Sequence, residues 1–233
     1  MVKKKKETKK KKETETERKP SKEIISKENQ QLIWFFLIVA VVFTSFLVPY
    51  FYIEGLKKFD FAGIEWVQEK YVNLEVYHGR FFAFNGADLI YNIYVRNDPR
   101  TNNVSVEGNF NIFRSEGFIS LGSGFENCRG EGVRAIADLS GFLRSGVGIT
   151  NLDVATTNLK FSKESGRTFA DCSTPKDVTV IRIQKGDGSW IYQDEENPFC
   201  YIINVDTCDD IKPIEKFMIE SISAFKTNSS ENQ

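Results

Sequence analysis

The chain has 233 residues, enough for one ordinary domain with tails or for two small domains. Lys and Arg number 31 and Asp and Glu 32, so the net charge is close to zero. The single histidine, His78, excludes zinc sites built on several histidines, and any Ser-His-Asp or Cys-His mechanism would have to use it. The four cysteines lack the C-x-x-C spacing of metal and redox motifs.

The charge is divided unevenly along the chain. Residues 1–30 contain eleven Lys and one Arg against six Glu, about +6, which leaves about −7 for the remainder. This segment repeats the hexapeptide KKKKET and has almost no apolar surface to offset the entropy lost on ordering, so we expect a disordered, Lys-rich cytoplasmic tail. The tail either contacts anionic lipid headgroups or is solvated and only reinforces topology; nucleic acid is not expected as a partner.

An uncharged run follows the tail. Leu32 to Ile53 is 22 residues long, about 33 Å of helix, which suffices to cross the hydrocarbon core of a bilayer. Trp34 at one end and two Tyr at the other suit the membrane interfaces. We expect a transmembrane helix over residues 31–54. The alternative is a secretory signal peptide, but the run is longer than the usual apolar region and no A-x-A-like cleavage site follows it.

Two features predict the orientation of this helix. More basic residues precede the span than follow it: Lys12, Arg18, Lys19, Lys22 and Lys27 before, and Lys57, Lys58 and Lys70 after. All four cysteines follow the span, which fits disulfides in an oxidising exterior, although reduced buried thiols would also fit. We therefore expect a single-pass protein of the cell membrane, with its N-terminus cytoplasmic and its C-terminal domain outside.

Residues 55–226 are expected to form one extracytoplasmic domain, followed by a disordered C-terminal tail over 227–233. Apolar and polar residues alternate from Val104 to Phe113, which predicts an amphipathic strand with one wet face. Farther on, Val178–Gln184, WIYQ and Phe199–Val205 are separated by the turn-like segments GDGS and DEENP. This pattern favours an antiparallel meander.

Two helices are expected in the same domain. Residues 132–146 place Val133, Ile136, Leu139 and Leu143 on one face. Residues 209–225 carry apolar side chains at helical spacing behind Asp210, which is suited to an N-cap. The expected fold class is therefore α+β: an N-terminal transmembrane helix and one mainly antiparallel β domain with about two helices.

A polar cluster of Arg96, Asp98 and Arg100 separates two apolar runs. Leu89–Val95 alternates before it and a strand is expected after it, which indicates a hairpin with residues 97–103 as its exposed connection. Asx-type turn chemistry accounts for the aspartate. The arginines either pair with Asp98 in a solvated loop or contact a partner or an anion.

Several other motifs suggest sites and have simpler interpretations. His78 is interpreted as a strand-end residue rather than a base. Gly130–Ala135 matches G-x-G-x-x-A before a helix, with Asp153 some twenty residues on, but the expected antiparallel pairing argues against a dinucleotide site. The acidic groups at Asp194–Glu196 and around residues 206–210 lack the spacing of a calcium loop. We expect no cofactor and no metal.

The cysteines Cys128, Cys172, Cys200 and Cys208 are expected to form disulfides. If a strand begins at Cys200, eight steps to Cys208 span up to about 26 Å, whereas bonded cysteines have Cα atoms about 5.5 Å apart. A bond between these two would require the chain to double back. We therefore expect cross-pairing with Cys128 and Cys172, in either of the two combinations. Two sequons make Asn103 and Asn228 candidate glycosylation sites under the expected topology.

Three segments behind the N-terminal anchor carry a resemblance: YVRNDPR (Tyr94–Arg100), CYIINVDTC (Cys200–Cys208) and IEKF (Ile214–Phe217). Together they resemble uncharacterised single-span surface proteins of small-genome archaea, over most of the exterior domain. The resemblance implies a place at the cell surface and brings no activity with it.

The leading hypothesis is therefore a membrane-anchored extracytoplasmic module that binds a protein or glycan partner or plays a structural part at the cell surface. One alternative is an accessory subunit of a membrane complex whose Lys-rich tail contacts lipid or cytoplasmic partners. A third hypothesis is a surface hydrolase that uses two carboxylates.

Overall fold

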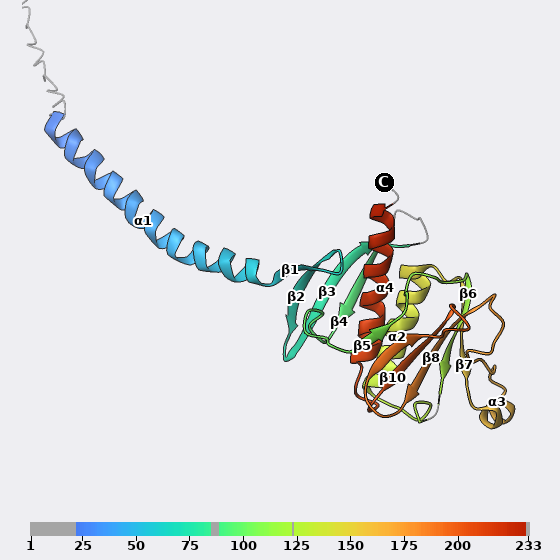
Figure 1. The fold of residues 1–233 in the computed structure, drawn as a ribbon. Helices are drawn as coiled ribbons and strands as arrows, with labels where there is room; N and C mark the ends of the chain where they lie inside the picture. The colour runs from blue at the N-terminus through green and yellow to red at the C-terminus, as the bar shows by residue number, and fades with distance from the viewer. Residues whose placement is uncertain (1–21, 85–88, 123, 232–233) are drawn as a thin grey trace, which may run out of the picture. The chain divides into compact units, whose positions relative to one another are not determined.

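The computed structural model describes residues 22–84, 89–122 and 124–231 (Figure 1). The chain divides into two compact units, Met1–Glu54 and Gly55–Gln233. This division coincides with the expected start of the domain at residue 55.

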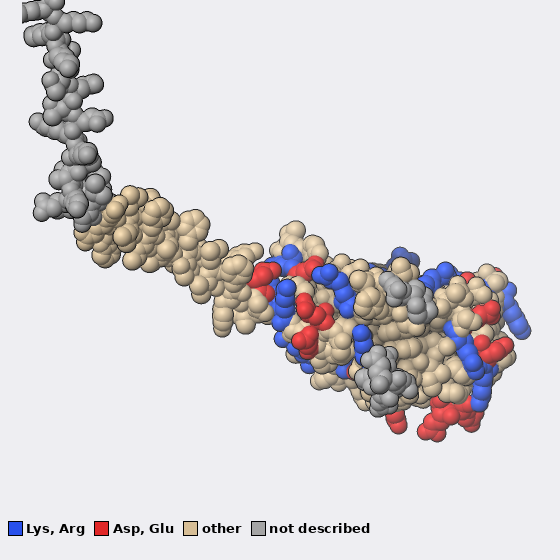
Figure 2. All heavy atoms as spheres, turned by 90° about the horizontal axis from the view of Figure 1, so that it is seen from above, with Lys and Arg blue, Asp and Glu red and all other residues tan. Residues whose placement is uncertain are grey.

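The described part of the first unit is one helix, α1 (Lys22–Leu56). Its segment Asn29–Leu56 has 28 residues and a mean hydropathy of 2.6, and none of its most apolar stretch is buried. Figure 2 shows it as a long surface almost free of charged side chains. By length and composition this helix is able to cross a membrane.

Helix α1 is longer than the sequence suggested at both ends. Residues 22–30, expected in the disordered tail, form its first turns. Lys, Glu and Gln have good helix propensity, and extending an existing helix requires no new nucleation. The rest of the expected tail, residues 1–21, lies outside the described residues.

The second unit begins with an antiparallel sheet. Its strands are β1 (Lys58–Phe61), β2 (Ile64–Tyr71), β3 (Leu74–Phe82) and β4 (Ile90–Val95), in the order β1-β2-β3-β4. Successive side chains point to opposite faces. Trp66, Phe81 and Ile93 are buried on the inner face, whereas Phe82 and Tyr94 are exposed on the outer one.

The other sheet has six strands. They are β5 (Ser105–Glu107), β6 (Glu116–Leu121), β7 (Asn151–Thr156), β8 (Thr179–Lys185), β9 (Trp190–Gln193) and β10 (Cys200–Val205). Their order is β5-β9-β10-β8-β6-β7. Only β9 and β10 pair antiparallel; the other neighbouring strands are parallel.

The expected antiparallel meander is therefore wrong for its first two strands, whereas its last two, β9 and β10, are antiparallel neighbours as expected. Strand β10 lies between β8 and β9, so the turn-like GDGS joins two strands that are not neighbours, and β8 pairs with β10 in parallel. Every residue of Cys200–Val205 is buried. A strand buried on both faces is typical of a parallel sheet covered on both sides.

The expected strand over Val104–Phe113 is also mostly wrong. Only Ser105–Glu107 forms a strand, and it belongs to a different sheet from β4, so the expected hairpin around residues 97–103 does not exist. Gly108 has a φ of 116°, a conformation that ends the strand. Beyond it the alternation is lost: Phe110 is buried, but Ile112 is 37% exposed.

The described part of the domain has four helical segments, rather than about two. They are α2 (Glu131–Gly141), the π-helix η1 (Phe142–Val147), α3 (Leu159–Ser165) and α4 (Lys212–Glu231). The first expected helix corresponds to α2 with η1, although Val133 is exposed and Ala135 takes its place in the core.

The second expected helix corresponds to α4, and its predicted apolar face is buried at Ile214, Phe217 and Ile222. Asp210 is not its N-cap, because the helix begins at Lys212 and the Ile211 carbonyl accepts the Glu215 N–H. The Asp210 carboxylate accepts a hydrogen bond from the Ser189 hydroxyl instead. The helix continues through residues 227–231, which were expected to be a disordered tail. Residues 232–233 lie outside the described part.

One core joins these elements. Helices α2 and α4 lie between the two sheets, which gives a β/α/β arrangement of three layers (Figure 1). Trp66 of the first sheet, Phe217 of α4 and Tyr201 of the second sheet belong to the same buried cluster. A smaller cluster of Val180, Cys200 and Ile202 covers the far face of the second sheet. The domain is thus α+β, with one antiparallel and one largely parallel sheet.

Candidate functional site

The polar cluster of Arg96, Asp98 and Arg100 lies in the segment that crosses from β4 to β5, and not in the loop of a hairpin. The backbone N–H groups of Arg96 and Asn97 donate to the Glu215 carboxylate at 2.7 and 3.0 Å, and the Asn97 side chain donates to it at 2.7 Å. Asn102, which is buried, donates to the Lys212 carbonyl at 3.0 Å. The cluster therefore joins the crossover to the first turn of α4.

The two arginines have different partners. Arg100 donates to Asp98 through two nitrogens, at 3.0 and 2.7 Å, and its guanidinium lies 3.9 Å from the centre of the Phe59 ring. The hydrogen bond from Arg100 lowers the pKa of Asp98. Arg96 pairs with Glu131 instead. Both guanidinium groups are thus bound within the domain, and a contact with an outside anion or partner stays a prediction.

His78 lies inside β3 rather than at a strand end. Its Nδ1 is 3.1 Å from Glu69, its Nε2 is 3.0 Å from Asn92, and its ring stacks on Tyr94 with centroids 4.5 Å apart. With both ring nitrogens engaged and no serine or cysteine among these contacts, the arrangement resembles a satisfied structural histidine more than a catalytic base.

The four cysteines form two disulfides, Cys128–Cys208 and Cys172–Cys200, each with Cα atoms 5.3 Å apart. This confirms the expected cross-pairing and the absence of a Cys200–Cys208 bond. The first disulfide joins the loop before α2 to the loop before α4. The second joins β10 to the loop that precedes β8.

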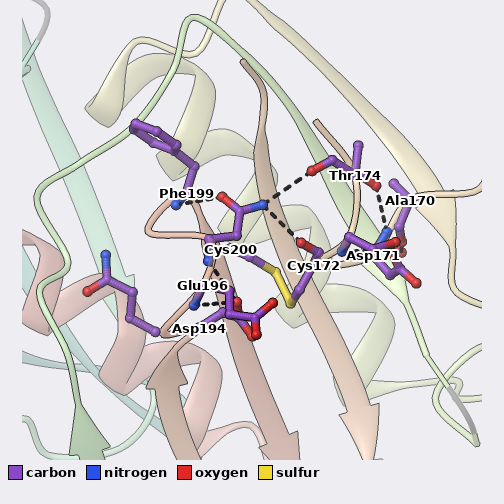
Figure 3. The surroundings of a disulfide bond; sticks show 12 residues. Ala170, Asp171, Cys172, Thr174, Asp194, Glu196, Phe199 and Cys200 are labelled. Carbon is purple, nitrogen blue, oxygen red and sulfur yellow. Dashed lines mark hydrogen bonds between the residues drawn. A yellow bond between two sulfur atoms is a disulfide. The ribbon is translucent and has the colours of Figure 1, made fainter. Parts of the chain in front are cut away.

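Figure 3 shows the second disulfide, Cys172–Cys200, with Thr174, Asp194 and Phe199 around it. The side chain of Asn197 joins these segments by hydrogen bonds and is called the Asn197 clamp below. Its amide donates to the carbonyls of Cys172 and Thr174, at 3.1 and 3.3 Å, and its oxygen accepts the Phe199 N–H at 3.2 Å. The Asp194 carboxylate in turn accepts the Asn197 N–H at 2.8 Å. Because Asn197 is almost fully buried, these bonds hold the loop after β9 in place.

This loop forms one wall of a groove of about 760 Å³. The groove, called the acidic groove below, is lined by Glu107, Gly108, Tyr192, Gln193, Asp194, Glu195, Glu196 and Pro198. Four of these side chains are carboxylates and none is basic. The acidic groove therefore favours a cationic group over an anionic one.

The glycine motif at Gly130–Ala135 has a structural explanation. The antiparallel pairing expected after this motif is wrong, because β6, α2 and β7 form a parallel β-α-β unit. However, a Cβ on Gly132 would lie 2.8 Å from the Cys208 carbonyl and 3.3 Å from the Cys128 side chain. The glycine thus permits the first disulfide to approach the helix and does not provide room for a phosphate.

The two candidate glycosylation sites lie in different elements. Asn103 is exposed in the crossover between the sheets, whereas Asn228 belongs to α4 and its side chain lies outside the described part. Within the described ranges, no group of three or more His, Cys, Asp or Glu side chains is arranged to hold a metal ion.

Comparison of the chain with protein-family models, with curated proteins and with solved structures finds no match.

Proposed function

We propose that this chain is a single-pass membrane protein whose second unit acts outside the cytoplasm as a binding or structural module rather than as an enzyme. One combination of features supports the proposal: a 28-residue apolar helix near the N-terminus, followed by a domain with two disulfides. Disulfides persist in oxidising compartments, and an apolar helix of this length spans a bilayer. The resemblance to archaeal surface proteins points the same way and stays a prediction.

The anchor is tested by alkaline extraction of membranes from cells that express the full chain. The protein should stay in the membrane pellet, and intact mass should include the residues before the span. A variant with two charges in the span, Val41→Arg with Phe43→Arg, is the matched control and should be released. A secreted chain that begins after residue 53 would show that α1 is a cleaved signal sequence.

The orientation has a separate test. Protease is added to intact cells after both disulfides are reduced, because the disulfides brace the loops of the second unit. Under the proposed topology the protease should digest the second unit. Full protection of the second unit until the cells are lysed would reverse the proposed topology.

The accessory-subunit alternative predicts a different set of partners. It is favoured by the twofold KKKKET repeat at the start of the chain. Pull-down of the full chain from its native membrane can be compared with that of a chain lacking residues 1–18. A binding module keeps its partners when the tail is deleted, whereas a tail-dependent subunit loses them.

A further inference from the structure

The turn between β2 and β3 exposes an apolar tip. We define the hairpin tip as Tyr71–Leu74. The exposed fractions of Tyr71, Val72 and Leu74 are 55%, 88% and 39%. None of these three side chains belongs to a buried cluster of the domain, although the Tyr71 hydroxyl donates a hydrogen bond to Glu69.

The backbone at the hairpin tip is unusual as well. Val72 has a φ of 57°, in the left-handed region, which β-branched residues rarely adopt. Two-residue hairpin turns ordinarily place Asn, Asp or Gly there. The two-residue turn therefore accounts for the positive φ of Val72, but not for an exposed valine in a place where Asn, Asp or Gly would be free of strain. Such an outlier is a reason to look for a function.

Strand register shows where the hairpin tip lies relative to the chain's exit from α1. Lys58 of β1 is opposite Val67 of β2, and the Lys57 carbonyl accepts the N–H of Gln68 at 2.8 Å. The chain therefore enters the sheet from the end at which β2 finishes. From Gln68 to Val72 is four strand residues, about 13 Å. The opposite end of β2 is occupied by the turn at Ala62 and Gly63.

The chain's exit from α1 is itself close to the span. Leu56 is the last residue of α1, and the uncharged run ends at Ile53. The headgroup region on each side of a bilayer is about 5–8 Å thick. A tip tethered about 13 Å from residue 57, on the same end of the sheet, is therefore within reach of the bilayer surface.

The side chains of the hairpin tip fit this position. Tyr and aliphatic residues are suited to the boundary between headgroups and acyl chains. Lys70 and Glu75 flank the tip opposite each other in the ladder, and Lys58 is exposed nearby. The apolar residues, rather than net charge, would therefore supply most of the attraction.

We propose that the hairpin tip inserts into the surface of the bilayer that α1 crosses, as a second contact between the domain and the membrane. This inference rests on the proposed membrane anchor. The contact would restrict the domain's rotation about its tether.

The test places a nitroxide label on the full chain in nanodiscs of phosphatidylcholine with phosphatidylglycerol. The Val72→Cys variant is labelled without reductant, so that both disulfides remain. The matched control is Val133→Cys, a valine of α2 that is 52% exposed. Collision rates with oxygen and with a water-soluble nickel complex are measured at both positions. The oxygen-to-nickel ratio at residue 72 should be about threefold or more above that at residue 133.

Three results would overturn the proposal. Equal ratios at the two positions mean that the hairpin tip is in water, and a fall in both collision rates at residue 72 means that protein covers it, such as a second copy of this chain. If the chain does not incorporate into nanodiscs, the anchor fails and the tip contact fails with it. Should the label at residue 72 prevent folding, Leu74→Cys gives the same measurement at a site without the unusual φ.

Discussion

The Glu215 carboxylate lies 2.7 Å from the backbone nitrogen of Arg96, a residue 119 positions away in the chain. This contact places a buried acid of α4 under the turn that carries the polar cluster, where it accepts two backbone N–H groups and the Asn97 side chain. The cluster is thus a joint between the two sheets and α4.

Replacing Glu215 by Ala should lower the free energy of unfolding by about 2–4 kcal/mol, because three donors lose their acceptor in a buried site. Denaturant unfolding of the full chain in detergent, followed by tryptophan fluorescence, measures the change. The control is Glu220→Ala on the same helix, where a partly exposed pair with Lys216 is removed and about 1 kcal/mol or less should be lost. Similar losses in the two variants would contradict the assigned role.

Glu215 also makes stability depend on pH. Burial raises the pKa of Glu215 above its ordinary value of 4.5, against the hydrogen bonds from Arg96 and Asn97. A raised pKa means that the folded protein binds more protons than the unfolded chain above pH 4.5. The stability that Glu215 contributes is therefore fully present below pH 4.5 and is lost as the pH rises through its pKa in the folded protein. Between pH 4 and pH 7 the Glu215→Gln variant should lose less stability than the wild type. Equal slopes would mean that the hydrogen bonds cancel the effect of burial on the pKa of Glu215.

The two disulfides should differ in what they contribute. They close loops with sequence separations of 80 and 28, which the chain-entropy model values at about 4.5 and 3.5 kcal/mol. Replacing Cys128 and Cys208 by Ala should therefore destabilise the domain by about 1 kcal/mol more than replacing Cys172 and Cys200. Paired unfolding curves test this order, and the reverse order would show that local strain or packing dominates.

The Asn197→Ala substitution should cost about 2–3 kcal/mol, since it leaves two partly buried carbonyls and the Phe199 N–H without their partner. Glu195→Ala, two residues earlier and exposed, is the matched control and should change stability by about 0.5 kcal/mol or less. Hydrogen exchange of the loop after β9 gives a second readout: Asn197→Ala should speed it up while the core strands keep their protection. A loop that exchanges at the wild-type rate in the variant would refute the clamp.

Val72→Asn should stabilise the domain by about 1 kcal/mol, because Asn tolerates a positive φ that Val does not. Ala62, with a φ of 53°, provides the comparison. Ala62→Gly relieves the same strain but makes the unfolded chain more flexible, so its net effect should be close to zero. If Val72→Asn instead weakens the domain, the Val72 side chain makes a stabilising contact within the protein, and the membrane contact loses part of its support.

Local patterns in the sequence were enough to predict features that depend on near neighbours. The apolar spacing of residues 211–222 predicted α4 because residues three and four apart share one face of a helix. The length of one extended step was enough to exclude a Cys200–Cys208 bond. Asn158, whose side chain caps α3 by accepting from Lys160 and Phe161, was a local signal that we missed.

Alternation in the sequence does not identify the partner of a strand. Strand β8 pairs with β10 rather than with β9, and β5 belongs to the second sheet instead of pairing with β4. Each strand takes the position that buries most apolar surface in the whole domain. The uninterrupted apolar run of β10 was the available signal of a parallel, doubly covered strand. Ile112 shows a different error. It continues the alternation of apolar residues that begins at Val104, but Gly108 ends the strand before Ile112 is reached.

The sequence by itself determined the long apolar helix, the helical faces and the disulfide that cannot form, since each follows from the geometry of a short stretch of chain. Only the tertiary structure decided which strands are neighbours and which cysteines pair. It also decided that Glu215 binds the backbone of Arg96 and Asn97 and so holds the polar cluster in place. These contacts join residues far apart in the sequence, and they form because burial in one common core leaves each polar group a single set of partners.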